Sequence, residues 1–273
     1  MDISSVITKM AVLVLLMLIG WLCAKLGVTS AESNKHDSKI VMDVLLVGTI
    51  LNSVINVQPS LSNREILMFF GLIIAEFAVF GIIAWLSPLC LRIKGADKGI
   101  SRNLILFMNN GFVGLPVVQV AFGSEAVFYA ALSNIPFNIL LYTIGVAQLG
   151  SGDGDRHFRW KDMVSVPLAA TLLAIPLFLL RIQVPAVLAD TVSTLAAATI
   201  PMSMIIIGTS LGGIPLKSAF GDWRAYALSF VKLIVCPVAV WAVLSPFITN
   251  AMMLGVLIII AACPAAMIIT VLC

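Results

Sequence analysis

The sequence predicts an all-α integral membrane protein built from two inverted five-helix repeats. Hydrophobic residues make up 61% of the 273 residues and charged residues 11%, whereas soluble domains carry roughly 25% charged residues. The apolar segments are continuous and do not alternate with polar residues, which excludes a membrane β-barrel. At about 20 apolar residues per helix the chain has room for about eight to ten spans and no soluble domain. Two interrupted spans at matching positions indicate the repeats.

The predicted spans follow one another along the whole chain. The first is kept as a span and not as a cleaved signal, because no small-residue cleavage site follows it. The ranges are 6–24, 40–55, 66–91, 107–123, 126–149, 163–180, 188–212, 225–247 and a ninth that starts near 252. Polar connections are expected at 25–39 and 92–102. The chain ends inside the ninth span, so we expect about nine spans, with the tenth missing from a truncated chain.

Basic residues predict how the spans are oriented. The connections after the first, third, fifth and seventh spans hold 12 of the 16 Lys and Arg residues, and the other connections hold only Arg64 and Arg181. Because basic connections stay in the cytoplasm, the N-terminus is expected outside and the polar loop 150–162 in the cytoplasm. The loop also divides the chain into a first repeat, 1–149, and a second, incomplete repeat, 163–273.

The fourth span is interrupted by residues that disfavour a helix. Asn109, Asn110, Gly111 and Gly114 have low helix propensity, and Pro116 lacks the N–H that would bond to the carbonyl four residues earlier. Unpaired backbone groups at membrane depth need protein or a watery cavity around them, so a broken helix indicates a transporter's binding site. A kink filled by neighbouring helices is the simpler alternative, but the two adjacent amides favour a polar site.

Pro264 interrupts the ninth span in the same way. This span is the fourth of the second half, as the span that contains Pro116 is the fourth of the first half. An odd number of spans per half inverts the second half relative to the first, which is the architecture of many secondary transporters. The matching prolines therefore support an inverted repeat, although the second break lacks the glycines and amides of the first.

Charged residues inside the spans each have a structural and a functional interpretation. Asp43 stands four residues after Lys39. It either forms an ion pair on the helix surface or supports a substrate or a proton near the inner mouth. Glu76 and Lys232 are expected to pair with each other or to face a cavity.

Amides and small residues add two further expectations. Asn134 and Asn138 share one face of the fifth span, from which they either reach the cavity or cap the broken backbone. Close helix packing is predicted for four small residues of the seventh span: Gly208, Ser210, Gly212 and Gly213.

Neither an enzyme, nor a cofactor, nor a metal site is expected. The five cysteines form no CxxC pair and are interpreted as small buried hydrophobes. His36 and His157 lie in connections, and the sequence holds no nucleophile elbow, HExxH motif or phosphate loop. An intramembrane enzyme would have to rely on the few charged residues within spans. The net charge of +3 gives no indication of a nucleic-acid partner.

Three segments of the chain resemble the auxin efflux carrier family, which includes plant PIN carriers and bacterial organic-acid permeases. They are NNGFVGLP at 109–116, ATIPMSMIIIGTSLGG at 198–213 and CPAA at 263–266. The resemblance covers nearly the whole chain and implies ten spans, with the fourth and ninth crossing beside the substrate. The chain departs from the family pattern at 46–48, where LVG replaces Leu-Pro-Ala, and at 166–167, where VP replaces Asn-Pro.

The sequence therefore predicts a secondary transporter that exports small organic acid anions across the inner (plasma) membrane of a bacterial cell. No ATP-binding motif is present, so the proton gradient or the membrane potential would drive it. A half-helix that begins near Pro116 would turn its positive end toward a bound carboxylate. A non-transporting receptor or scaffold, or an inactive truncated carrier, is the alternative, and a homodimer stays open.

The candidate site residues fall into two groups. The predicted substrate-binding residues are Asn109, Asn110, Gly111, Gly114, Pro116 and Pro264. The predicted support or proton-binding residues are Asp43, Asn134 and Asn138.

Overall fold

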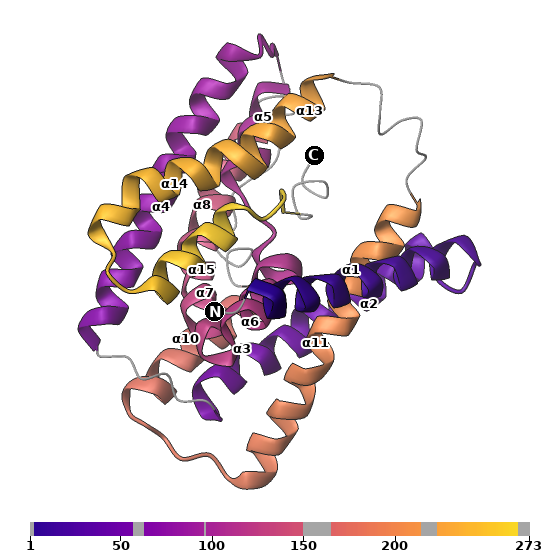
Figure 1. The fold of residues 1–273 in the computed structure, drawn as a ribbon, viewed down its shortest axis with the longest axis vertical. Coiled ribbons are helices and arrows are strands. Elements are labelled where there is room, and N and C mark those ends of the chain that lie inside the picture. The colour runs from indigo at the N-terminus through magenta and orange to yellow at the C-terminus, as the bar shows by residue number, and fades with distance from the viewer. Residues whose placement is uncertain (1–2, 57–62, 96, 150–164, 214–222, 267–273) are drawn as a thin grey trace. The chain divides into compact units, whose positions relative to one another are not determined.

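The computed structural model describes residues 3–56, 63–95, 97–149, 165–213 and 223–266. These residues form helices and no β-strand, so the predicted all-α fold class is confirmed for the described part of the chain (Figure 1). The loop 150–162, with His157, lies outside the described residues.

The chain forms two compact units, each made of three chain segments. The first unit comprises Met1–Ser60, Gly111–Phe128 and Ala169–Asp222, and the second comprises Leu61–Asn110, Tyr129–Leu168 and Trp223–Cys273. Each unit takes segments from both sides of the loop 150–162. The predicted division into repeats, which follows chain order, therefore stays a prediction.

Most helices of the first unit come from the beginning of each predicted repeat. They are α1 (Ile3–Lys25), α2 (Ala31–Ile40), η1 (Val41–Leu45), α3 (Leu46–Ile55), η2 (Asn110–Gly114), α6 (Leu115–Phe122), α10 (Val166–Leu179) and α11 (Ala186–Gly213). The helix α7 (Ser124–Leu132) leads from this unit into the second. Segments η1 and η2 are π-helical turns, in which backbone hydrogen bonds span five residues.

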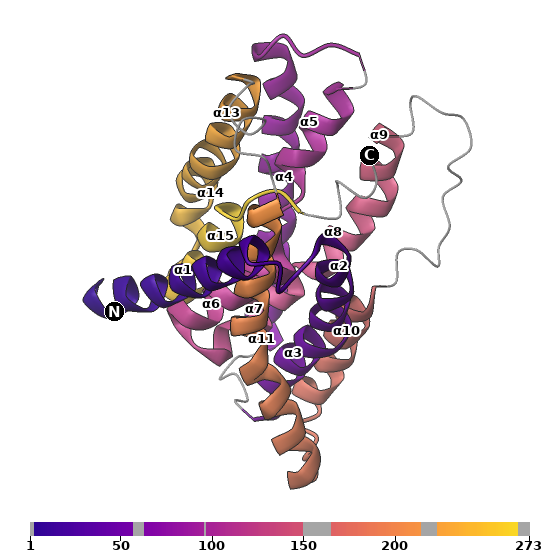
Figure 2. The same ribbon diagram turned by 90° about the vertical axis from the view of Figure 1, so that its right-hand side faces the viewer.

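The second unit holds the two helices that end at the breaks. Its helices are α4 (Asn63–Cys90), α5 (Asp97–Leu106), α8 (Asn134–Leu140), η3 (Leu141–Gly145), α9 (Val146–Leu149), α13 (Trp223–Phe230), η5 (Val231–Val235), α14 (Cys236–Leu244), η6 (Ser245–Phe247) and α15 (Ala251–Ala261). Helix α4 lies beside α5 and α14 (Figure 2). Phe69 and Phe80 of α4 are fully buried in this unit.

Five described helices are long and apolar enough to cross a membrane. They are Ile7–Lys25, Glu32–Ile55, Arg64–Cys90, Ala186–Gly213 and Trp223–Phe247, and shorter apolar helices cover Asn110–Phe122, Val166–Leu179 and Ala251–Ala261. The chain is therefore a multi-pass membrane protein. The predicted total of nine spans and their inverted arrangement stay predictions.

The predicted polar connection 25–39 and the short second span 40–55 need correction. The chain is helical from Ala31, so the helix begins nine residues before the predicted span. Ser30 is the N-cap: its side chain accepts from the Ser33 N–H at 3.1 Å, and Ser33 Oγ accepts from the Ser30 N–H at 2.9 Å. This capping box stabilises a polar first turn, which a search for apolar residues does not detect.

Two other predicted boundaries also differ from the structure. The predicted fifth span, 126–149, is interrupted at Ser133 between α7 and α8. Pro136 explains the interruption, because it cannot donate a hydrogen bond to the Leu132 carbonyl. The predicted connection 92–102 is helical from Asp97, whose carboxylate in the first turn favours the helix N-terminus.

Glycines allow α1 and α11 to approach closely in the first unit (Figure 1). A Cβ atom added to Gly208 would collide with the backbone of Met17, and one added to Gly20 would collide with the backbone of Ile205. Thr209 Oγ1 donates to the Gly20 carbonyl oxygen at 3.2 Å across the same contact. The predicted close packing is therefore confirmed at Gly208 and at Gly212, where an added Cβ would be 2.6 Å from Ala24 Cβ, and is wrong at Gly213, where nothing lies within 4 Å.

Candidate functional site

The first helix break lies earlier than the sequence predicts. Helix α5 ends at Leu106, and a new helix, Asn110–Phe122, starts after an interval of three residues. The break itself is confirmed. The α-helix α6 begins at Leu115, close to the predicted start near Pro116, but the π-helical turn η2 extends this helix back to Asn110. Pro116 lies in the first turn of α6, where its fixed φ fits a helix. The turn that precedes α6, η2, is π-helical.

The second helix break lies at the predicted proline. Helix α15 ends at Ala261, and the chain leaves the helix through Ala262 and Cys263 before Pro264. The Ala262 N–H still donates to the Ile258 carbonyl oxygen at 2.9 Å. Pro264 has no N–H with which to continue this ladder.

The two breaks pair with each other inside the second unit. Met108 and Ala265 form an isolated antiparallel bridge. The Asn109 N–H donates to the Pro264 carbonyl oxygen at 2.8 Å, and the Ala266 N–H donates to the Phe107 carbonyl oxygen at 3.0 Å. Each break therefore satisfies backbone groups that the other has released. We call residues 107–109 and 264–266 the crossover.

An amide pair lies directly beside the crossover. Asn110 Nδ2 donates to Asn134 Oδ1 at 3.1 Å, to Ser133 Oγ at 2.8 Å and to the Ala130 carbonyl oxygen at 3.2 Å. Both asparagine side chains are buried, yet Asn110 Oδ1 and Asn134 Nδ2 have no partner among the described residues. The pair therefore presents one open acceptor and one open donor. Asn138 Nδ2 donates to the Asn134 carbonyl oxygen at 2.8 Å. Of the two alternatives predicted for Asn138, reaching the cavity or capping the backbone, this bond corresponds to the second.

A buried lysine occupies the end of the helix that the first break cuts off. In a continuous helix the Ile105 carbonyl would accept from the Asn109 N–H, which instead bonds to Pro264. Lys232 Nζ replaces it and donates to the Ile105 carbonyl oxygen at 2.9 Å. A cation is favourable at the negative C-terminal end of a helix. The sequence reveals that Lys232 is an intramembrane charge, but it does not reveal this partner.

The remaining predicted site residues lie in the first unit. Gly111 packs against a neighbouring helix, because a Cβ there would be 3.1 Å from Leu46 Cδ1. Gly114 and Pro116 lie in the helix Asn110–Phe122. Asp43 is half-buried in η1 and forms no ion pair with Lys39 in the described structure. The structure thus brings Asn109 to Pro264 and Asn110 to Asn134 within the second unit. Gly111, Gly114, Pro116 and Asp43 belong to the first unit.

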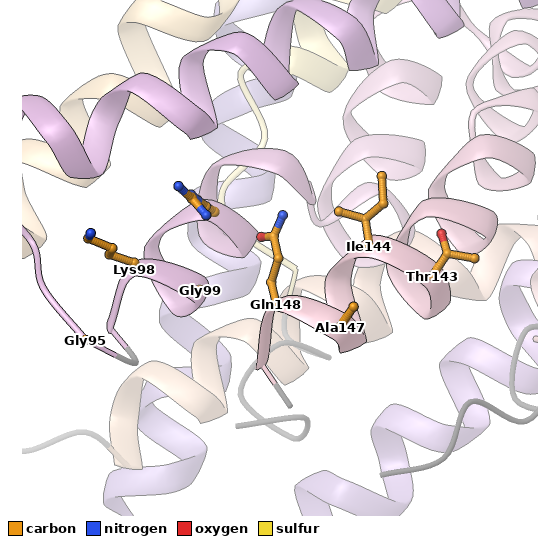
Figure 3. Close-up of a pocket in the computed structure, with 8 residues that line it drawn as sticks. Gly95, Lys98, Gly99, Thr143, Ile144, Ala147 and Gln148 are labelled. Carbon is orange, nitrogen blue, oxygen red and sulfur yellow. The ribbon is translucent and has the colours of Figure 1, made fainter. Parts of the chain in front are cut away.

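A basic pocket that the sequence did not predict lies at the start of α5. It has a volume of about 700 Å³ and is lined by Gly95, Lys98, Gly99, Arg102, Thr143, Ile144, Ala147 and Gln148. Figure 3 shows Lys98 on α5 and, to its right, the segment that carries Thr143, Ile144 and Gln148; the Lys98 side chain extends away from that segment. None of the lining residues that the structure describes is acidic, so this part of the pocket suits an anion. Lys98 and Arg102 lie one helical turn apart, and this spacing could have indicated the pocket. In the sequence, the two residues served only to predict the orientation of the spans in the membrane.

Comparison with known sequences agrees with this architecture of broken apolar helices. The sequence profile of a family described as "Membrane transport protein" matches residues 5–158 and 153–273. The chain belongs to this family. Its resemblance to the auxin efflux carriers is thereby confirmed, and the transporter is a member of a membrane transport family and not of an enzyme family.

Two archaeal relatives match the transporter over almost its whole length. The "Uncharacterized transporter" of Methanothermobacter thermautotrophicus is 26% identical over an alignment of 272 positions, which covers 97% of this chain and 86% of the relative. The "Uncharacterized transporter MJ1031" of Methanocaldococcus jannaschii is 26% identical over an alignment of 267 positions, which covers 94% of this chain and 84% of the relative. Neither name specifies a substrate, so the chemistry of the site has to suggest one.

Proposed function

We propose that this transporter exports small organic acid anions across the plasma membrane. The observation that carries the proposal is the Asn110–Asn134 amide pair beside the crossover, buried and yet incompletely bonded. A buried polar atom without a partner costs about 1–3 kcal/mol. A ligand that bonds to these atoms recovers that free energy, whereas a purely structural pair would be expected to satisfy them internally.

Several donors near the break favour an anionic ligand. Asn134 Nδ2 is an open donor, and the helix Asn110–Phe122 begins at the break, so its first N–H groups and its dipole favour negative charge. We propose that Asn109, Asn110 and Pro264 form the substrate contact, with Asn134 and Asn138 in support. Gly111, Gly114 and Pro116 are proposed from the sequence alone, as is a supporting role for Asp43.

The open acceptor on Asn110 narrows the substrate class further. A carboxylate has no proton to give to Asn110 Oδ1, but a hydroxyl group on the same molecule does. We therefore expect hydroxy acids, or dicarboxylates that retain one proton, to bind more tightly than simple fatty acids.

The distribution of basic residues supports the orientation and direction of transport. With the N-terminus outside, the connection after α4 is cytoplasmic, and so is the basic pocket with Lys98 and Arg102. Clustered cations raise the local concentration of anions and speed their capture. The pocket would thus collect the substrate from the cytoplasm. The sequence has no ATP-binding motif, so the proton gradient or the membrane potential would supply the driving force.

The test is flux of radiolabelled mono- and dicarboxylates in proteoliposomes that contain the purified transporter. Asn110→Ala is expected to abolish substrate binding while the protein stays folded. The matched control is Asn52→Ala, because Asn52 is a buried amide of the first unit whose Oδ1 accepts from Asn56 Nδ2 at 2.7 Å. This control should lose stability but keep its substrate affinity.

Two results would contradict the proposal. Unchanged affinity in Asn110→Ala would place the substrate elsewhere. Binding of a carboxylate without flux would instead support the receptor or scaffold alternative.

A further inference from the structure

Two opposite charges are buried together in the second unit without bonding to each other. Glu76 of α4 is 0% exposed and Lys232 of η5 is 4% exposed. Both Glu76 carboxyl oxygens lack a hydrogen-bond partner among the described residues. Lys232 Nζ lies 4.5 Å from the centre of the Phe80 ring, and Phe80 follows Glu76 by one helical turn on the same face of α4. The ammonium group is therefore close to Glu76 but bonds to the Ile105 carbonyl oxygen.

This arrangement is unusual for a static ion pair. A buried ion pair is stable only when its geometry is good and further hydrogen bonds satisfy both groups. In the conformation described, an ionised Glu76 would have no hydrogen bond at all, which is far more costly than burying the neutral acid. Lys232 Nζ donates to the backbone carbonyl at the end of α5 and not to the Glu76 carboxyl group.

Few other ionisable groups surround the Glu76 carboxyl group. Helices α5, α8, α14 and α15 pack against α4, as do Lys232 of η5, over the Phe80 ring, and Tyr129 of α7, against the Phe69 ring. Cys236 begins α14 and Cys263 follows α15, and both thiols are buried. Helix α8 has no ionisable side chain, and Arg102 of α5 lies over the Trp85 ring, more than two turns along α4 from Glu76. Lys232 is therefore the only cation that faces this carboxyl group in the described structure.

We propose that Glu76 binds the coupling proton and that Lys232 alternates between Ile105 and Glu76. This inference rests on the proposed function, because it assigns the ion that drives the anion flux. When the Glu76 acid releases its proton to water, the ammonium group leaves the Ile105 carbonyl and bonds to the new carboxylate. Lys232 stays protonated throughout, so one proton moves and the total charge of the pair falls by one.

The exchange of partners links proton binding to the crossover. Once Lys232 leaves, the Ile105 carbonyl needs another donor, and the Asn109 N–H is the group that would bond to it in a continuous helix. Asn109 can supply this bond only by giving up its 2.8 Å bond to the Pro264 carbonyl oxygen. Proton release therefore extends α5 by part of a turn and opens the crossover, beside which Asn110 holds the proposed substrate. Proton binding restores the pairing described above.

Glu76→Gln tests the proton site because glutamine imitates the neutral acid but cannot release a proton. We expect it to retain exchange of labelled substrate for unlabelled substrate and to lose accumulation driven by a pH gradient. Glu65→Gln is the matched control: the same substitution in the first turn of the same helix, expected to keep both activities. Equal gradient-driven accumulation in Glu76→Gln and the wild type would overturn the inference.

Infrared titration of the purified protein tests the same site without any substrate. The wild type should show a carboxyl C=O band that disappears as the pH rises, and Glu76→Gln should lack this band while Glu65→Gln retains it. If this pattern is found but no carboxylate is transported, the proposed function fails and the proton site stands. If Glu76→Gln keeps the band, the proton site fails whatever is transported.

A crosslink tests the link to the crossover in a protein that retains Glu76. Met108 and Ala265 are a directly opposed antiparallel pair, a geometry that suits a disulfide. In Met108→Cys/Ala265→Cys, oxidation should hold the crossover closed, abolish transport and abolish the pH response of the carboxyl band, with recovery after reduction. A carboxyl band that still responds to pH in the oxidised protein would contradict the coupling.

Discussion

The close contact between α1 and α11 makes Gly208→Ala a sensitive test of the fold. A Cβ at Gly208 would meet the Met17 carbonyl group and would lie 2.9 Å from the Trp21 backbone nitrogen. All of these atoms belong to the backbone, so no side-chain rotation can relieve the collision. Helix α1 would have to move away, and the bond from Thr209 Oγ1 to the Gly20 carbonyl oxygen would lengthen.

The expected loss of stability follows from three opposing contributions. Overpacking a tight contact costs about 1–3 kcal/mol, and an interhelical hydrogen bond in a membrane contributes about 0.6 kcal/mol. Alanine recovers about 0.5–1 kcal/mol, because glycine is the poorer residue in a helix interior. The net change for Gly208→Ala is therefore a destabilisation of about 0.6–3 kcal/mol.

Gly71→Ala provides the matched control, since nothing lies within 4 Å of a Cβ added at Gly71 in α4. This variant keeps only the favourable contribution and should be more stable than the wild type by about 0.5–1 kcal/mol. The assay is reversible unfolding in mixed micelles with increasing denaturing detergent, followed by circular dichroism. The reasoning would be refuted if both variants unfolded at the same detergent concentration.

Three further outcomes are expected from transport and labelling assays. Asp43→Asn should lower uptake in parallel at every pH, because Glu76 and not Asp43 carries the proton; a flattened pH profile would transfer that role to Asp43. The double substitution Lys98→Ala/Arg102→Ala should weaken the capture of dianions more than that of monoanions. The measurement is the Michaelis constant for uptake from the cytoplasmic side, and an equal effect on dianions and monoanions would show that the pocket does not belong to the transport pathway. A cysteine placed within 150–162 should be protected from an impermeant thiol reagent in intact cells, and labelling from outside would invert the proposed orientation.

The sequence predicted the helix breaks because their causes are local. Proline lacks a donor, and asparagine and glycine disfavour helices, wherever they occur in the chain. The exact start of the second half-helix was missed because Pro116 is compatible with the first turn of a helix. The start of α2 at Ala31 was also missed, because hydropathy assigns its polar first turn to a connection, whereas a capping box stabilises that turn as a helix.

The contacts that give the site its chemistry could not be predicted, because they join distant parts of the chain. Lys232 and Ile105 are 127 residues apart, and nothing near either residue identifies the other. The bond exists because the Asn109 N–H is diverted to Pro264, which is itself a long-range event. The Asn110–Asn134 pair could be anticipated only as two polar residues in consecutive spans.

The crossover also constrains how the protein is made. Asn109 leaves the ribosome 157 residues before Ala266, which at roughly 5–20 residues per second is a delay of about 8–30 s. During this interval the first break has no partner, and unsatisfied peptide groups are strongly unfavourable in hydrocarbon. The newly inserted fourth segment must therefore wait as an unbroken helix, with Asn109 bonded to Ile105, or in contact with the insertion machinery. The break then forms only when translation delivers Pro264 and Ala266, so this part of the fold is completed long after the fourth segment has been inserted.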